Sequence, residues 1–328
     1  MSEITLNSCL RDVEQIPALQ DLQGQFLVQP SPMAQRFTGM PFSGMRAPGQ
    51  ECRVDAMVRG LQHLLACAET GHKIRWPVWP PEAVAQQPDR AQAQLLHLPG
   101  KPGAPFVVVC AGGGYQCIVT YTEGLTAAAE LNAAGYHAFV LNYRVRQKQL
   151  MPKPIDDLAQ AVRLVLNHAD ELGVDRRYAV MGFSAGGHLA AEWGTVNCGY
   201  RHYALPAPEA LVLCYPAIDL RTLHGNQTAD EFYASMQDQN GSVDDYCVNL
   251  HMDASYPPTY VWQCEDDDVV DFANYRILCE ALERYGIPHK ARSYSRGGHG
   301  LSNPHDPEAD RWMSDVLAYL DEKLPVTR

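Results

Sequence analysis

The fold is decided at Tyr178-Ala-Val-Met-Gly-Phe-Ser184-Ala-Gly-Gly187-His-Leu-Ala190. The first four residues form a short apolar run typical of a strand, and the residues from Leu189 onward have an Ala-rich, helical composition. Between them, residues 182–186 match G-x-S-x-G, in which a serine occupies a very sharp strand-to-helix turn. Glycine suits such a turn because only a residue without Cβ tolerates a strained backbone and the close approach of neighbouring chain. The stretch therefore predicts that Ser184 is a nucleophile, in preference to an incidental serine in a glycine-rich turn.

Strands and helices alternate on both sides of this stretch. Apolar runs predict strands at 105–110, 138–141, 178–181, 210–215, 258–263 and 289–294. Helical patterns lie at 124–134, from Pro154 onward, at 271–285 and at 308–324. Such alternation predicts an α/β fold with a mostly parallel central sheet and helices on both faces. Active sites in sheets of this kind lie at the carboxyl ends of the strands.

The residues before this alternation form a different kind of segment. Residues 1 to about 50 look irregular, and 29–49 are rich in Pro, Gly, Met and Phe. We interpret 29–49 as a strap packed on the main domain, with a wall of the substrate site as the alternative. An amphipathic helix is predicted at 52–69, and strands at 73–79 and 91–98. We therefore divide the chain into an N-terminal extension, 1–100, and a catalytic domain, 101–328, with a lid-like insertion near 221–256 that includes a short helix at 230–236.

Composition limits the classes of partner. The 328 residues are 46% hydrophobic and carry a formal net charge of −12, which disfavours a nucleic acid or an anionic membrane as the main partner. No apolar run is long enough to cross a bilayer, and the N-terminus lacks the features of a secretion signal. The ten cysteines include no C-x-x-C pair, and several lie in apolar runs. We expect a cytoplasmic protein with reduced thiols, and homo-oligomerisation is left open.

A triple glycine follows the strand at 105–110, in Ala111-Gly-Gly-Gly-Tyr115. Its exposed amide groups suit an oxyanion, which needs preorganised donors. A phosphate cradle is less favoured, because the loop lacks the G-K-[ST] ending of a P-loop. We expect the N–H groups of Gly113, Gly114 and Ala185 to form an oxyanion hole, with Tyr115 as a substrate-binding residue.

Two further loops provide a base and an acid. His299 lies between Gly298 and Gly300 after the last predicted strand, and His305 is its only rival by position. His188, inside the helix after Ser184, is interpreted as structural. The loop at 265–271 contains four adjacent acids, and a base histidine needs one carboxylate to hold its tautomer. These residues leave the choice of acid open.

The chain from about residue 105 resembles the α/β-hydrolase superfamily, and more narrowly the bacterial acetyl xylan esterase and feruloyl esterase-like group. The resemblance is carried by Val109-Cys-Ala-Gly-Gly-Gly-Tyr115, Val140-Leu-Asn-Tyr-Arg144, Gly182-Phe-Ser-Ala-Gly-Gly-His188, Pro257-Pro-Thr-Tyr-Val-Trp262 with Asp266-Asp267, and Gly297-Gly-His-Gly300. It implies an α/β-hydrolase fold and a Ser184–His299–Asp267 triad. In that group the acid precedes a proline by four positions, and Asp271 occupies that place here. Asp266 therefore stays open as the acid.

The resemblance implies a serine esterase that works through an acyl-enzyme without cofactor or metal. We expect it to remove acetyl or other short acyl groups from small-molecule or oligosaccharide esters. Amide hydrolysis, as in arylformamidases or prolyl peptidases, is the alternative, and a non-catalytic binding protein is the third reading. The pair Cys247 and His251 is interpreted as structural, because two ligands without a partner cluster are poor grounds for a metal site. Several aromatics are candidates for stacking on a sugar, with core packing as the alternative: Trp76, Trp79, Tyr115, Tyr233 and Tyr246.

Overall fold

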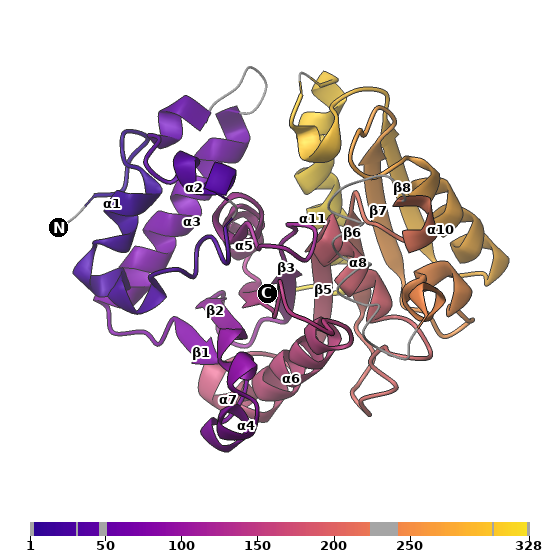
Figure 1. The fold of residues 1–328 in the computed structure, drawn as a ribbon, viewed down its shortest axis with the longest axis horizontal. Coiled ribbons are helices and arrows are strands. Elements are labelled where there is room, and N and C mark those ends of the chain that lie inside the picture. Colours follow the sequence, from indigo (N-terminus) through magenta and orange to yellow (C-terminus); the bar gives the residue numbers. More distant parts are fainter. Residues whose placement is uncertain (1–2, 31, 46–50, 224–241, 304, 327–328) are drawn as a thin grey trace.

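The computed structural model describes residues 3–30, 32–45, 51–223, 242–303 and 305–326. Within these ranges the chain forms an eight-stranded sheet in the order β1-β2-β4-β3-β5-β6-β7-β8 (Figure 1). Strands β3 to β8 run parallel, while β1 and β2 pair antiparallel at one edge. The strands are β1 Arg75–Pro77, β2 Gln94–Leu98, β3 Phe106–Cys110, β4 His137–Asn142, β5 Tyr178–Phe183, β6 Ala210–Cys214, β7 Thr259–Cys264 and β8 His289–Tyr294. The predicted α/β-hydrolase fold class is confirmed.

Both faces of the sheet are covered by apolar packing. Side chains alternate across a strand, so Phe106, Val108 and Cys110 of β3 belong to one core and Val107 and Val109 to the other. The first core includes residues of α6 Lys153–Asn167, α8 Ala185–Glu192 and α10 Ala273–Arg284. The second includes residues of α3 Glu51–Glu69, α5 Leu125–Ala133 and α11 Trp312–Lys323. The centre of the sheet, which carries Ser184, is therefore held rigidly from both sides.

The start of the chain is more regular than expected. Residues 1–50 were predicted to be irregular, but their described part contains α1 Leu10–Glu14, η1 Pro17–Leu22, α2 Pro32–Phe37 and η2 Phe42–Met45. These helices are too short to produce a visible 3.6-residue period, which is why the pattern misses them. Phe42 is only 1% exposed and belongs to the same core as α3, so this part of the segment packs on the main domain, as the strap interpretation expects.

The amphipathic helix predicted at 52–69 is α3, which lies against α5 (Figure 1). Strands β1 and β2 also come from the first hundred residues, and β2 pairs along its whole length with β4. The N-terminal segment therefore supplies two strands of the sheet as well as a helix that covers it. The short helices α4 Pro81–Gln86 and η3 Pro88–Gln92 connect these two strands.

Other differences from expectation lie near the strand ends. A π-helical turn, η4 Thr120–Gly124, precedes α5 and was not predicted. The last helix, expected at 308–324, begins as the 3-10 turn η9 Pro307–Arg311 before α11. The lid helix predicted at 230–236 lies outside the described residues. After it the chain forms η6 Val243–Tyr246 and η7 Val248–Leu250; α7 Ala169–Leu172, η5 Leu220–Leu223 and η8 His299–Leu301 complete the helices described. In the described ranges, no helix has the length and apolar character that a membrane span requires.

Candidate active site

Ser184 occupies a strained turn between β5 and α8. Its backbone has φ 51° and ψ −117°, in a region that side-chain-bearing residues rarely adopt. A Cβ on Gly182 would lie 2.0 Å from the carbonyl oxygen of Gly186, and one on Gly186 would lie 2.2 Å from that of Cys110. Glycine is therefore required on both sides, and the turn holds the Ser184 hydroxyl at the carboxyl end of the central strand.

Three side chains from distant parts of the sequence form one hydrogen-bonded row. The hydroxyl of Ser184 lies 2.9 Å from Nε2 of His299. Nδ1 of His299 lies 3.0 Å from Oδ1 and 2.9 Å from Oδ2 of Asp267. The Asp267 side chain is fully buried and that of His299 is 19% exposed, so the row runs from the interior toward solvent. This is the arrangement by which a carboxylate orients an imidazole that removes a proton from a serine.

The two neighbouring aspartates make different contacts. Asp267 also accepts the N–H groups of Val269 and Val270 at 3.0 and 2.9 Å through Oδ1. Oδ1 of Asp266 accepts the N–H groups of Gly297 and Gly298, each at 2.8 Å. Asp267 therefore contacts the imidazole, whereas Asp266 holds the backbone of the loop that carries it.

The loop around His299 needs its glycines. Gly297, Gly298 and Gly300 have φ values of 155°, 65° and 63°. Nε2 of His305, the positional rival, lies 2.8 Å from Asp310 and not beside Ser184. The structure thus brings His299, and not His305, to the predicted nucleophile.

The triple-glycine loop lies beside the nucleophile, since a Cβ on Gly112 would lie 2.9 Å from Cβ of Ser184. Gly113 has φ 134° and Gly114 φ 60°, and the carbonyl of Gly113 accepts the N–H groups of residues 116 and 117. Among the described residues, no hydrogen bond occupies the N–H groups of Gly113, Gly114 or Ala185. The N–H of Gly112 is already used, because it donates to Oε2 of Glu123 at 2.6 Å. The first two glycines of the loop thus have different roles.

Tyr115 does not offer its ring to a substrate. The ring is 3% exposed, and its hydroxyl lies 2.7 Å from Nδ1 of His188. Nε2 of His188 lies 2.8 Å from the carbonyl oxygen of Tyr246; because a carbonyl only accepts, Nε2 donates there and Nδ1 accepts from Tyr115. Burial lowers the pKa of His188 to about 4, so the ring is neutral. The Tyr115 ring is therefore held in a buried pair with His188, which is structural as interpreted.

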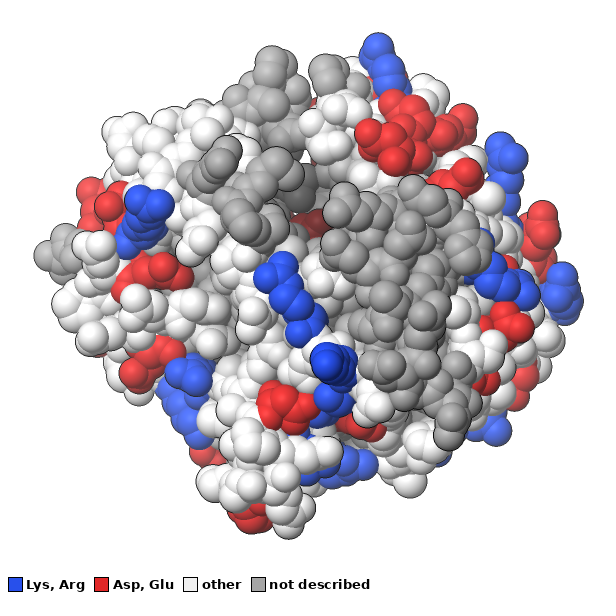
Figure 2. Space-filling view, viewed as in Figure 1, with Lys and Arg blue, Asp and Glu red and all other residues white. Residues whose placement is uncertain are grey.

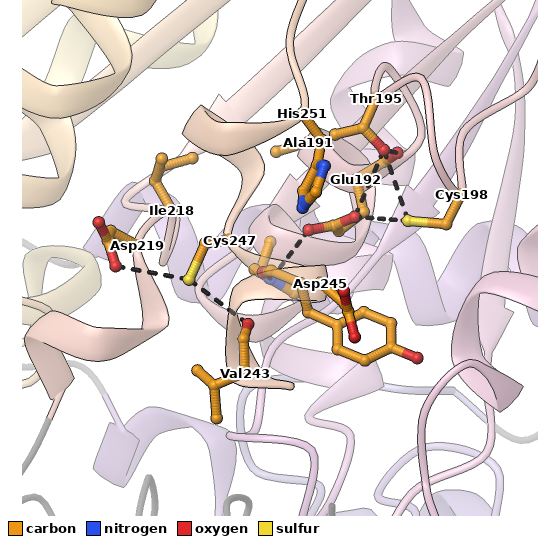
Figure 3. Close-up of polar contacts among 12 residues, drawn as sticks. Ala191, Glu192, Thr195, Cys198, Ile218, Asp219, Val243, Asp245, Cys247 and His251 are labelled. Atoms are coloured by element: carbon orange, nitrogen blue, oxygen red, sulfur yellow. Dashed lines mark hydrogen bonds and ion pairs between the residues drawn. The ribbon is translucent and has the colours of Figure 1, made fainter. Parts of the chain in front are cut away.

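A second buried polar group follows on the same helix. Glu192 accepts the thiol of Cys198 at 2.7 Å and lies near the hydroxyl of Thr195 (Figure 3). Burial raises the pKa of Glu192 to about 8, so its carboxyl is protonated at neutral pH. Cys247 points instead toward Asp219. Nε2 of His251 lies 2.8 Å from the carbonyl oxygen of Asp244. In the described part of the chain no three metal-ligating side chains converge, and Cys247 and His251 have separate partners.

We expect the free energy of unfolding to fall as the pH rises toward 8, because the native state keeps a proton on Glu192 that the unfolded chain has released. The groups facing this carboxyl are His188, Cys198 and the phenols of residues 115, 246 and 256. In Glu192→Gln the side chain is neutral at every pH. This variant should therefore lack the pH-dependent fall in the free energy of unfolding, which is on the order of a few kcal/mol. Urea unfolding of the wild type and the variant at pH 5.5 and 8.5 measures this difference. An equal change in the free energy of unfolding between the two pH values in both proteins would contradict a buried neutral Glu192.

Two other aromatic candidates, Trp76 and Trp79, pack in or against the core. Trp76 is 6% exposed, and the indole N–H of Trp79 donates to Asp157 at 2.6 Å. Asp157 also pairs with Arg144, and the side chains of both are almost completely buried. Tyr233 lies outside the described residues. Core packing therefore describes Trp76 and Trp79 better than sugar stacking.

One cavity adjoins the triad, and a second cavity shares part of its lining. A small one of about 20 Å³, room for one water-sized group, is lined by residues that include Phe183, Tyr215 and Gly300, next to Ser184 and His299. A larger one of about 420 Å³ lies between α3, α5 and α11 and shares Thr126, Ala127 and Trp312 with the first. Figure 2 shows a hollow near the centre of one face, with acidic atoms at its floor. The space beside the nucleophile is thus narrow, and the wider cavity shares residues of its wall.

The sheet order and the Ser–His–Asp row define an α/β-hydrolase. A protein-family model described as BD-FAE matches residues 96–282, more than half of the chain. The chain therefore belongs to the BD-FAE family of α/β-hydrolases, a family of esterases, and the resemblance stated from the sequence is confirmed.

Two sequence relatives and one solved structure are similar to this chain. The chain is 32% identical over 217 residues to endo-1,4-beta-xylanase B of Butyrivibrio fibrisolvens, covering 63% of this chain and 34% of that protein. It is 29% identical over 255 residues to an acetylxylan esterase of Xylanibacter ruminicola, covering 73% of this chain and 51% of that protein. The crystal structure of an acetyl ester-xyloside bifunctional hydrolase from Caldicellulosiruptor lactoaceticus superposes with a TM-score of 0.65 at 28% identity, over 77% of this chain and 97% of that one. The chain thus spans about a third of the length of the xylanase and about half of the length of the acetylxylan esterase.

Proposed function

We propose that this protein is a serine esterase that hydrolyses carboxylic esters through an acyl-enzyme, with Ser184, His299 and Asp267 as its triad. The observation that carries the proposal is the continuous row from the Ser184 hydroxyl through His299 to Asp267. A strained serine at the start of a helix, beside amides that have no hydrogen-bond partner among the described residues, is also what acyl transfer requires.

In the first half of the reaction, His299 takes the proton of Ser184 as its oxygen attacks the ester carbonyl carbon. The N–H groups of Gly113, Gly114 and Ala185 stabilise the oxyanion, and Asp267 stabilises the imidazolium. The intermediate collapses, the alcohol leaves with the proton from His299, and the acyl group stays on Ser184. Water then attacks the acyl-enzyme with His299 as the base, releasing the carboxylic acid and restoring the hydroxyl.

The finer proposal is deacylation of carbohydrate esters with short acyl groups. The small cavity beside Phe183 leaves little room for a long acyl chain. The larger cavity is lined by charged and hydroxyl side chains from α3, α11 and the turn η9, among them Arg59, Ser314 and Asp310, together with Trp312, a combination that suits a sugar. Two of the similar proteins are named for an acetylated xylan or an acetyl ester-xyloside substrate, which supports acetyl groups on a xylan-type sugar.

A substrate panel tests the proposal. We expect kcat/KM to be highest for acetyl esters, to fall from p-nitrophenyl acetate to the butyrate and octanoate, and to be measurable on acetylated xylo-oligosaccharides. N-formylkynurenine and dipeptide anilides are the comparison substrates, because the same triad also cleaves amides in other proteins. Faster turnover of either amide than of any acetyl ester would replace the esterase by an amide hydrolase.

A further inference from the structure

Glu123 makes two contacts that the triad mechanism does not use. It lies in the π-helical turn η4, between the triple-glycine loop and α5. Its Oε2 accepts the N–H of Gly112 at 2.6 Å, and its Oε1 accepts the hydroxyl of Tyr215 at 3.0 Å. One carboxylate thus joins two segments that are 11 and 92 residues away from it. Single π-helical turns are rare in proteins, and those that occur are often found at functional sites. We therefore expect this turn to have a function.

The first contact fixes the start of the oxyanion loop. Gly112 is buried, and a Cβ on it would lie 2.9 Å from Cβ of Ser184 and 3.0 Å from Oε2 of Glu123. Its carbonyl oxygen accepts the N–H of Val119 at 3.1 Å. Gly112 is therefore held between the nucleophile and the carboxylate, and its placement determines where the following amides, those of Gly113 and Gly114, point.

The second contact fixes the neighbour of the base. Tyr215 is 2% exposed, and its ring lies edge-on to His299, with 4.9 Å between the ring centroids and 71° between the planes. A Cβ on Gly300 would lie 3.0 Å from the Tyr215 hydroxyl, so the His299 loop closes over this ring. The preceding residue, Cys214, accepts the N–H of Ser184 at 2.9 Å. Tyr215 is thus packed between the nucleophile's strand and the imidazole.

We propose that Glu123 is a positioning residue, which couples the oxyanion loop to Tyr215 and so holds the oxyanion donors and His299 in register with Ser184. The inference rests on the esterase function proposed above. Glu123 transfers no proton, and its bonds go to groups that do not themselves react. A carboxylate suits this task because hydrogen bonds to an ionised acceptor are shorter and stronger than neutral ones. Donors held in advance need no reorganisation when the oxyanion forms.

Variants of Glu123 and of its partner Tyr215 test the proposal. Glu123→Ala removes both bonds, and we expect kcat for p-nitrophenyl acetate to fall about 100-fold with KM within about threefold, since small misplacements of reacting groups cost this much. Glu123→Gln retains an oxygen for Gly112 and an N–H for the Tyr215 oxygen, so kcat returns to within about tenfold of wild type. Tyr215→Phe lowers kcat about tenfold alone but less than about twofold in the Glu123→Ala background, because the two residues act as a unit.

The matched control is Glu14→Ala. Glu14 also accepts a glycine N–H, that of Gly24 at 3.1 Å, but on α1, in the N-terminal segment. Its loss removes the same kind of bond without touching the site, and we expect kcat to stay at the wild-type value.

A transition-state analogue separates positioning from stability. A phenylboronic acid forms a tetrahedral adduct with an activated serine and places an oxygen in the oxyanion hole. We expect its inhibition constant in Glu123→Ala to rise in proportion to the loss of kcat, measured well below the melting temperature of each variant. A Glu123 that only stabilised the fold would lower the melting temperature and leave both constants of the folded protein unchanged.

Each outcome decides the proposal. A kcat for Glu123→Ala within threefold of wild type overturns it. If that variant does not fold, Tyr215→Phe decides, and wild-type kcat and boronate affinity there overturn the proposal. Failure of the esterase function is recognised separately, because Ser184→Ala would then retain activity. An inactive Ser184→Ala beside a fully active Glu123→Ala removes only the role of Glu123.

Discussion

Ser184→Ala is expected to lower kcat on p-nitrophenyl acetate by about 10⁶-fold, the loss typical of triad knockouts. The hydroxyl lies 2.9 Å from the base, and no other hydroxyl bonded to His299 is found among the described residues. Without it no acyl-enzyme forms, so the remaining rate comes only from substrate binding and the oxyanion donors. Steady-state kinetics with p-nitrophenyl acetate measures the effect.

The matched serine control is Ser293→Ala. Ser293 lies on β8 and its hydroxyl donates to Glu265 at 2.9 Å, away from the imidazole. We expect this variant to keep wild-type kcat. A fluorophosphonate should label the wild type and Ser293→Ala with one group per chain and leave Ser184→Ala unlabelled. Labelling of Ser184→Ala at the wild-type rate would mean that another residue is the nucleophile.

The second large effect concerns the two adjacent aspartates. Asp267→Asn is expected to lower kcat about 10⁴-fold, because an amide N–H facing Nδ1 favours the wrong tautomer of His299. Asp266→Asn should cost less than about tenfold, because a single oxygen, Oδ1, accepts both loop N–H groups and an asparagine retains that oxygen. The comparison of kcat between the two isosteric variants measures the difference in role.

Asp266→Ala completes this series. It removes the acceptor of Gly297 and Gly298, and so loosens the loop while leaving the carboxylate beside His299 in place. We expect an intermediate loss of kcat, together with a lower melting temperature. If Asp266→Asn proved as damaging as expected for Asp267→Asn, the acid of the triad would have to be reassigned.

The sequence predicted the parts of the site that depend on local geometry. Ser184 and His299 each lie among glycines because the backbone there must turn sharply, and that requirement is visible in neighbouring residue types. The continuous apolar strands were visible for a similar reason, since a strand buried on both faces carries apolar residues without interruption. The parallel sheet followed from their alternation with helices.

Contacts between distant residues were not predictable in the same way. Asp266 and Asp267 are chemically identical neighbours, and only the folded turn sends one to the imidazole and the other to the loop backbone. Glu123 and Tyr215 were missed because their bond joins β6 to the turn before α5. The only local signal was an acid between the triple glycine and the Ala-rich helix, which has no meaning without Gly112 beside it. The burial of the Tyr115 ring and its bond to His188 could not be read from its sequence neighbours either.

The antiparallel edge of the sheet has a practical consequence for trimming the gene. The segment that defines the family begins at residue 96, in the middle of β2, whose residues pair with β4 from Gln94 to Leu98. A fragment expressed from that point would lack α3, and the apolar surface of α5 that α3 covers would face water. Cutting at the family limit at 282 would also delete His299 and α11. The smallest unit suitable for fusion to another module therefore extends well beyond the segment by which the family is recognised, in both directions.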